Sequence, residues 1–117
     1  MRYKISKYFL TSTKRKIKYC FLNNNSQITI VFFHGFMSDM NGAKPKAIQS
    51  FCNKQKLNFL KFEYSGHGKS SGKFTDGNIS KWTNDAKQII KAKVKKNKNL
   101  IFVGSSMGSW IALNLFL

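Results

Sequence analysis

Short apolar runs alternate with longer amphipathic segments along the chain. The runs Ile5–Leu10 and Ile17–Leu22 are rich in aromatic and β-branched residues and are separated by a polar stretch, a pattern that predicts a two-stranded hairpin. Ile28–Phe33 is almost continuously apolar, which is typical of a strand buried on both faces of a parallel sheet. Phe59–Tyr64 predicts another strand, and Leu100–Val103 predicts a third buried one.

Amphipathic helices are predicted between these strands. Pro45 suits the first turn of a helix, and Asn78 suits the N-cap of a second helix. The apolar segment 109–117 follows the last strand as a third helix. The apolar positions are Ala47, Ile48, Phe51 and Cys52 on one face of the first helix, and Ile79, Trp82, Ala86, Ile89 and Ile90 on the second.

From residue 28 onward the predicted order is therefore strand and helix, repeated three times. This alternation favours a parallel sheet covered by helices, so the fold class is α/β. The length of 117 residues allows a single domain. No stretch approaches the ~18 consecutive apolar residues of a membrane-spanning helix, and none is expected.

The charge is strongly unbalanced, with 21 Lys and Arg against 4 Asp and Glu and a net charge of +17. Only two of the basic residues are arginine, whereas nucleic-acid readers favour arginine because its planar guanidinium grips phosphate and guanine at two points. The lysines are scattered, apart from a dense run at 93–98. We expect a solvated basic surface and no specific nucleic-acid partner. An electrostatic patch for nucleic acid or an anionic membrane is the alternative.

Targeting and cysteine signals are weak. The first ten residues lack the apolar core of about 7–15 residues that a secretory signal has, and they are not the Arg-rich segment of a transit peptide. Cys20 and Cys52 are too few for a disulfide framework, and no Cys/His cluster has metal-ligand spacing. We expect a cytoplasmic location, buried thiols, and no metal or organic cofactor.

The segment 104–108, Gly-Ser-Ser-Met-Gly, fits the pattern G-x-S-x-G. The pentapeptide alone is weak evidence, but here it follows a predicted strand and opens a predicted helix, as this motif requires. A sharp strand-to-helix turn would hold Ser106 in a strained backbone conformation with its hydroxyl clear of the sheet. Gly104 and Gly108 would flank it because a side chain at either position would crowd the turn or the neighbouring strand. We interpret Ser106 as a nucleophile.

A second part of the same site is predicted in the loop His34-Gly35-Phe36, after the first buried strand. Gly35 would let the backbone bend, so that the N–H of Phe36 faces the N–H of Met107 across the site. Two such preorganised donors stabilise an oxyanion, and losing one typically costs ~2.7–4 kcal/mol of barrier. The predicted oxyanion hole therefore consists of the Phe36 and Met107 amides.

These motifs resemble the α/β-hydrolases, and more narrowly the palmitoyl-protein thioesterase branch that also cleaves acyl glucuronides, with its bacterial esterase relatives. Ser109 stands where a second glycine is common in that branch, and Glu63 where aspartate is frequent. The similar blocks are 34–40, 64–70, Asp76-Gly77 with Trp82, and 104–108 with Trp110, within residues 5–117.

The resemblance implies a three-layer fold, with an N-terminal hairpin followed by parallel strands that alternate with helices. It also implies a serine hydrolase that cleaves carboxylic esters or thioesters through an acyl-enzyme on Ser106, acting on small-molecule or acylated-protein substrates. Phe36, Met37, Met107 and Trp110 are candidates to line an acyl pocket, although a helix–strand core explains Trp110 equally well. Acyl preference, leaving group and oligomeric state stay open.

The remaining catalytic groups are not identified. In this fold the triad order is Ser, then Asp or Glu, then His, whereas His34 and His67 both precede Ser106, so we interpret both as structural. We expect a domain truncated after the nucleophile helix and inactive by itself, with base and acid beyond Leu117. The alternative is a non-catalytic basic remnant that binds an anionic partner through its lysines. All four acids also precede the serine: Asp39, expected either to cap the first helix or to bind backbone in its loop, Glu63, Asp76, and Asp85, expected on a helix face.

Overall fold

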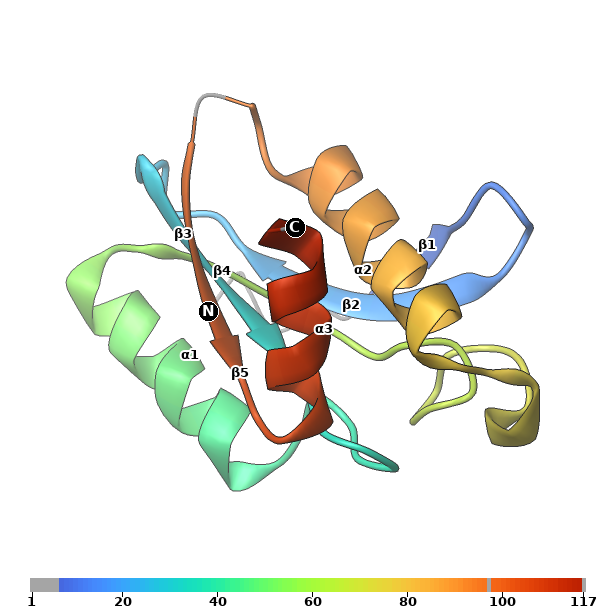
Figure 1. The fold of residues 1–117 in the computed structure, drawn as a ribbon. Coiled ribbons are helices and arrows are strands. Elements are labelled where there is room, and N and C mark those ends of the chain that lie inside the picture. Colours follow the sequence, from blue (N-terminus) through green and yellow to red (C-terminus); the bar gives the residue numbers. More distant parts are fainter. Residues whose placement is uncertain (1–6, 97, 117) are drawn as a thin grey trace.

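A computed structural model, which describes residues 7–96 and 98–116, places five strands in one mixed sheet with helices on both faces (Figure 1). The strands are β1 (Lys7–Leu10), β2 (Lys16–Leu22), β3 (Ile28–Phe33), β4 (Asn58–Phe62) and β5 (Asn99–Gly104). The helices are α1 (Ala43–Gln55), α2 (Ile79–Lys93) and α3 (Met107–Phe116), with a 3₁₀ turn η1 at Phe74–Asp76. Across the sheet the order is β1-β2-β4-β3-β5.

The N-terminal hairpin predicted from the sequence is present as β1 and β2, which pair antiparallel with Leu10 opposite Lys16. Ile5 and Ser6, the start of the predicted first strand, lie outside the described residues. β2 also pairs antiparallel with β4, and Cys20 lies opposite Lys61. The hairpin is thereby joined to the parallel part of the sheet, in which β3 pairs with β4 and β5.

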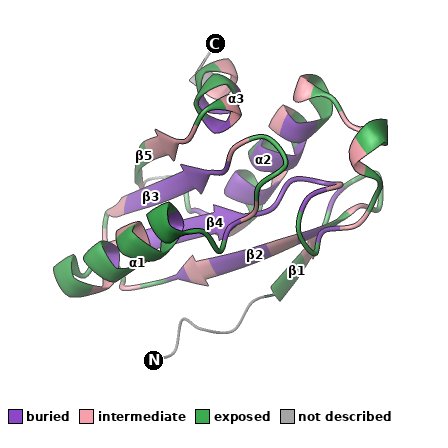
Figure 2. Cartoon of the chain, turned by 90° about the horizontal axis from the view of Figure 1, so that it is seen from below, coloured by how far each residue is buried: buried purple, intermediate pink, exposed green. Residues whose placement is uncertain are grey.

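β3 and β4 form the buried centre of the sheet (Figure 2), and the burial of β3 agrees with its almost continuous apolar run. Successive side chains of a strand point to opposite faces, so β3 supplies two cores. Val31 and Phe33 belong to the larger core with residues of α2 and α3, while Ile30 and Phe32 belong to the smaller one with Cys52 of α1. The chain therefore has three layers, with helices on either side of the sheet.

β5 differs from the third buried strand that the sequence predicts. Leu100 and Ile101 are 38% and 47% exposed, and the other residues of this strand are exposed or half-buried. The reason is its position, because within the described residues β5 has β3 on one side and no strand on the other. The expectation that its far edge is unpaired holds in this part of the chain.

α1 contains the expected proline in its first turn, but the expected buried face is wrong in part. Ala47 is exposed and Phe51 is 53% exposed. The contacts with the sheet come from Pro45 and Cys52, both buried, and from half-buried Ile48. These three positions follow the spacing of three and four residues that defines one helical stripe, and the other two lie on the neighbouring stripe.

α2 begins as predicted from its N-cap, because the Asn78 side-chain oxygen accepts a hydrogen bond from the Lys81 N–H at 2.8 Å. Its apolar stripe packs on the sheet, with Trp82, Ala86 and Ile89 buried. On α3, by contrast, large apolar side chains remain exposed. Within residues 7–96 and 98–116, no helix is long and apolar enough to cross a membrane.

Candidate active site

Ser106 lies in the turn between β5 and α3 and has a backbone φ of 56°. Residues other than glycine rarely occupy this left-handed region, and they do so at a cost of about 1–3 kcal/mol. Hydrogen bonds hold the turn on both sides of the serine. The Ser105 N–H donates to the Phe33 carbonyl at 3.1 Å, and the Ser109 N–H donates to the Ser106 carbonyl at 2.9 Å. The strained conformation expected at this serine is therefore present, and the Ser106 residue is exposed.

The two flanking glycines permit this turn because backbone atoms approach them closely. A Cβ on Gly104 would lie 2.5 Å from Ser109 Cα and N, inside the turn itself. A Cβ on Gly108 would overlap the Phe33 carbonyl of the adjacent strand. Both positions thus exclude a side chain for the reasons that the sequence suggests.

The loop after β3 lies against this turn. A Cβ on Gly35 would lie 3.6 Å from Ser106 Cβ and 3.2 Å from the Ser105 carbonyl oxygen, so the two segments are in contact. Phe36 follows in this loop. Met107 opens α3, and its N–H has no carbonyl partner within the helix because the first four N–H groups of a helix have none. The structure therefore brings the three predicted groups, Phe36, Ser106 and Met107, to one place.

These groups surround a cavity of about 770 Å³ at the carboxyl ends of the parallel strands. Trp110 lines it and is 60% exposed, so among the described residues it belongs to the cavity wall rather than to the core. Met37, which the sequence also suggests for this pocket, is 70% exposed and lies outside the lining. The residues that line the cavity are Phe36, Asn78, Ile79, Trp82, Ser106, Met107 and Trp110.

His34 holds the loop in place. Its Nδ1 lies 2.8 Å from the Gly35 carbonyl oxygen, to which it donates in the tautomer that leaves Nε2 as an acceptor. Nε2 accepts from the Tyr64 N–H at 3.3 Å, and the Tyr64 hydroxyl donates to the His34 carbonyl at 3.0 Å. Burial lowers the pKa of His34 to about 4, although the bond to the Gly35 carbonyl opposes this shift. The imidazole is therefore neutral near pH 7, in agreement with a structural role.

His67 is also buried, and its Nδ1 lies 3.2 Å from the Ser65 carbonyl oxygen. Its ring packs edge-on against Trp82, with 4.9 Å between centroids. Burial lowers the pKa of His67 as well, with the bond to the Ser65 carbonyl acting in the opposite direction. In the described part of the chain, neither imidazole is hydrogen-bonded to Ser106.

The acidic residues also have partners away from the serine hydroxyl. Asp39 accepts from the Asn41 N–H in its own loop at 2.8 Å, one of the two roles expected for it. Asp85 lies on α2, as expected, but on its buried face, where it pairs with Arg15 at 2.6 Å. These contacts account for both carboxylates without a catalytic role.

Glu63 has a role that the sequence analysis did not predict. Its buried carboxylate accepts from the Met40 N–H at 3.3 Å and from the Lys69 N–H at 2.8 Å. It thereby ties the loop that contains Phe36 to the glycine-rich turn after β4. The available signal was an acid directly after a largely apolar strand, where a charge is stable only if hydrogen bonds satisfy it.

Three further neighbours of the site also lacked an assigned role. Asn78 and Ile79 line the cavity although the sequence marks them only as the start of a helix. Lys44 Nζ lies 3.4 Å from Ser105 Oγ, a contact between residues 61 positions apart that no local pattern announces.

Comparison with known proteins relates this chain to hydrolases. The Hydrolase_4 family, described as "Serine aminopeptidase, S33", matches residues 24–117. The palmitoyl-protein thioesterase ABHD10, mitochondrial, of Rattus norvegicus is 38% identical over 85 residues, which are 73% of this chain. The matched region is 28% of that relative, so the chain spans just over a quarter of its length.

Two solved structures are similar over nearly the whole chain. Alpha/beta hydrolase domain-containing protein 10 from mouse has a TM-score of 0.88 and 31% identity, and covers 95% of this chain and 43% of its own. A putative hydrolase from Agrobacterium vitis S4 has a TM-score of 0.86 and 33% identity, and covers 95% of this chain and 44% of its own. The sheet and its helices are thus shared with both.

Proposed function

Because the chain belongs to the serine aminopeptidase S33 family of α/β-hydrolases, we propose that it forms the nucleophile-bearing part of a serine hydrolase for carboxylic esters or thioesters. The resemblance to α/β-hydrolases and palmitoyl-protein thioesterases is confirmed, and the relatives support hydrolysis in general. The family description names an aminopeptidase, so the family alone does not select esters or thioesters as substrates. That selection is our proposal. The main support is the strained, exposed Ser106 at the mouth of an apolar cavity.

In the proposed reaction, Ser106 Oγ attacks the acyl carbon of the substrate and gives its proton to a general base. The negative charge develops on the former carbonyl oxygen, where the amides of Phe36 and Met107 would hold it. Collapse expels the alcohol or thiol, and water then releases the acid from the acyl-enzyme. The position of Met107 in the first turn of α3 supports this assignment, because the positive end of the helix dipole favours an anion there.

The base and its acidic partner are the other half of the proposal. A serine hydroxyl without a base is a weak nucleophile near neutral pH, and in the described residues both histidines are buried in structural contacts. We place both groups beyond Leu117, which agrees with the short span of the chain relative to the thioesterases it matches.

The cavity supports an apolar acyl group as the part of the substrate that is bound. Its volume of about 770 Å³ falls within the range of small-molecule pockets, and aromatic rings from three segments, Phe36, Trp82 and Trp110, form its walls. Asn78 is the polar residue beside Ser106 in the lining. A medium to long acyl chain would fill this space without leaving a buried polar group unpaired.

The cytoplasmic location inferred from the N-terminus stays a prediction. The thioesterase relatives are named mitochondrial, which describes those proteins.

Labelling of Ser106 tests the proposed function. In the full product of the gene, Ser106→Ala is expected to abolish labelling by a fluorophosphonate probe and to lower turnover of acyl esters and thioesters at least a thousandfold. Ser105→Ala, one residue away, is the matched control and should still be labelled. Labelling that persists in Ser106→Ala would assign the nucleophile elsewhere and overturn the proposal.

A further inference from the structure

We propose that the mouth of the Ser106 cavity docks on an anionic membrane surface, from which an apolar acyl chain enters the cavity. The use of the cavity rests on the proposed function, whereas docking itself needs no catalysis. The two ideas can therefore be tested and can fail separately.

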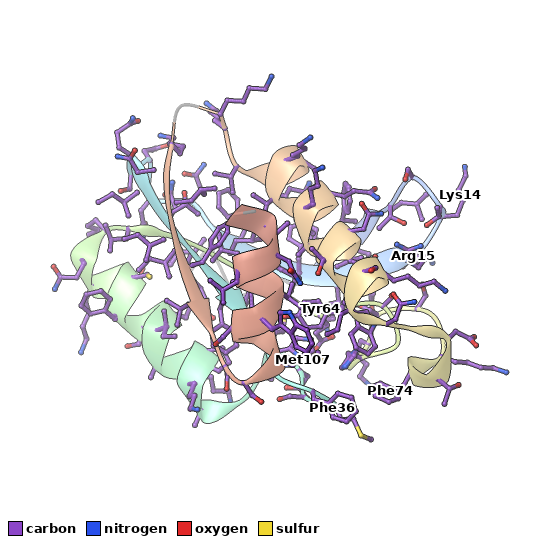
Figure 3. All side chains as sticks on the ribbon, viewed as in Figure 1. Lys14, Arg15, Phe36, Tyr64, Phe74 and Met107 are labelled. Carbon is purple, nitrogen blue, oxygen red and sulfur yellow. The ribbon has the colours of Figure 1, made fainter. Side chains whose placement is uncertain are left out.

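The apolar part of this surface is the rim of the cavity. Phe36 and Trp110 line the cavity and are 56% and 60% exposed, while Met37 and Leu113 beside them are 70% and 61% exposed. Phe36 packs edge-on against Phe74 with 5.0 Å between ring centroids, and the two lie near Met107 at one end of the molecule (Figure 3). Large apolar side chains exposed together mark an interaction surface, and Trp and Phe are common at membrane interfaces.

Lysines lie around this rim. Lys44 Nζ is 3.4 Å from the hydroxyl of Ser105, the residue before the proposed nucleophile. Lys81 lies one helical turn after the cavity residue Asn78, and its Nζ donates to the Asp76 carbonyl at 2.8 Å. Lys73 directly precedes Phe74. A polybasic surface of this kind is attracted to anionic lipids, and the attraction declines within a Debye length.

Few acidic groups oppose these lysines. Glu63 and Asp85 are 1% and 0% exposed, and Arg15 neutralises Asp85. The other two acids are the half-buried Asp39, two residues after Met37, and the exposed Asp76, two residues after Phe74. They offset part of the charge of the three rim lysines, in a chain whose net charge is +17. The rim therefore combines an apolar centre with a positive surround, which is the pattern of interfacial membrane binding.

The same features favour a membrane over a nucleic acid. Nucleic-acid binding would use the lysines and would gain little from Met37, Leu113 or the apolar cavity below them. Arginine, which reads phosphates and bases most effectively, is absent from the described rim. An anionic bilayer accounts for both the charge and the exposed apolar side chains.

Vesicle binding tests the docking surface. We expect the purified protein to sediment with vesicles of phosphatidylcholine and phosphatidylglycerol and not with phosphatidylcholine alone, and to dissociate as salt screens the charges. The double variant Phe36→Ser/Met37→Asn should weaken binding roughly tenfold or more, because it removes apolar surface that would be buried. Asn is chosen at position 37 because it tolerates the φ of 53° found there.

Matched variants locate the effect. Phe51→Ser removes a side chain of similar exposure, 53%, from α1 and should leave vesicle binding unchanged. Lys44→Gln should weaken binding by about fivefold, whereas Lys54→Gln, near the other end of α1, should have a smaller effect. Equal losses at both members of either pair would overturn the proposal, as would absence of binding to anionic vesicles.

Tryptophan fluorescence, which does not need the double variant, covers the case in which that variant does not fold. Brominated lipids should quench the fluorescence of the vesicle-bound protein, and most of the quenching should be lost in Trp110→Phe, where only Trp82 remains, 4% exposed in the cavity wall. Vesicle-bound protein in which Trp110 is not quenched would contradict membrane docking. Binding that RNA displaces and that the rim variants do not weaken would contradict it as well. Fluorophosphonate labelling without vesicle binding would reject docking alone, and the reverse result would reject the proposed function alone.

Discussion

Ser106 and His34 show how single residues hold the site together. The serine is kept in its left-handed conformation by backbone contacts on either side, and the histidine holds the loop opposite it. The His34 imidazole and carbonyl bond to the N–H and hydroxyl of Tyr64, so a single residue pair joins the end of β4 to the loop after β3. Neither contact requires a charged imidazole.

The neutral state of His34 makes stability depend on pH. Its pKa is about 4 in the folded protein and near 6.5 in the unfolded chain, so the unfolded chain binds more protons between these values. The stabilisation is therefore complete above pH 6.5 and is lost as the pH falls toward 4, by up to about 3 kcal/mol. Burial shifts the pKa of His67 in the same direction.

Urea unfolding between pH 7.5 and pH 4.5, followed by circular dichroism, measures this effect. His34→Gln should be less stable at neutral pH and should have a shallower dependence on pH, with the part due to His67 remaining. An unfolding free energy that stays constant across this range would contradict the assignment.

Among single residues, the sequence predicts the roles of those whose contacts lie within a few neighbouring positions. Ser106, Gly104 and Gly108 belong to one pentapeptide, and its turn imposes their geometry. Glu63 and Lys44 act through residues distant in sequence, on other loops and turns. Their contacts depend on how β-strands and helices meet, which no short pattern contains.

Among the elements, α2 is fixed to the N-terminal hairpin by a buried ion pair. Asp85 of α2 pairs with Arg15 at 2.6 Å and also accepts from the Ser65 N–H at 2.9 Å. Three segments therefore meet at one carboxylate that is 0% exposed. This contact sets the position of α2, which provides Trp82 to the cavity.

Asp85→Ala is expected to destabilise the protein by about 3 kcal/mol or more, because removing one partner leaves the Arg15 charge and the Ser65 N–H without their acceptor. The exposed Asp76→Ala is the control and should change the unfolding free energy by less than about 0.5 kcal/mol. Thermal and urea unfolding of the two variants measure the difference. Equal stability of both variants would show that the ion pair contributes nothing.

The sequence predicts correctly which segments form helices and strands, but it predicts less well which of their residues are buried. The periodicities of α2 and β3 agree with the structure because each has one consistent environment along its length. The interpretation of residues 100–103 as a buried strand failed because an apolar run reports composition and does not report how many neighbours the strand has. The same reasoning explains Phe51, whose stripe on α1 no element covers in the described structure.

For the molecule as a whole, the two edges of the sheet differ. β1 forms one edge of the described sheet with four residues, and β5 forms the other with six. Both edges carry exposed apolar side chains, Tyr8 and Leu10 in β1 and Leu100 and Ile101 in β5. An apolar strand with open backbone groups is a template for pairing with another chain. The longer β5 edge offers more backbone groups to a second chain, so self-association of the protein should occur through β5.

Ile101→Lys tests this expectation, because a lysine on an edge strand opposes edge-to-edge pairing. We expect it to reduce association in sedimentation velocity, while the unfolding free energy changes by no more than about 1 kcal/mol. Tyr8→Lys places the same charge at a residue of similar exposure, 54%, on the opposite edge, and it should leave association unchanged. Association that responds to Tyr8→Lys and not to Ile101→Lys would assign the contact to β1.

The strand order also determines when the sheet becomes complete during synthesis. β4 is available to β3 early, whereas β5, its other neighbour, begins 66 positions after β3 ends. At translation rates of about 5–20 residues per second, this interval lasts roughly 3–13 seconds. During that time β3 has one unpaired edge, and an apolar strand edge of this kind makes a nascent intermediate prone to aggregation.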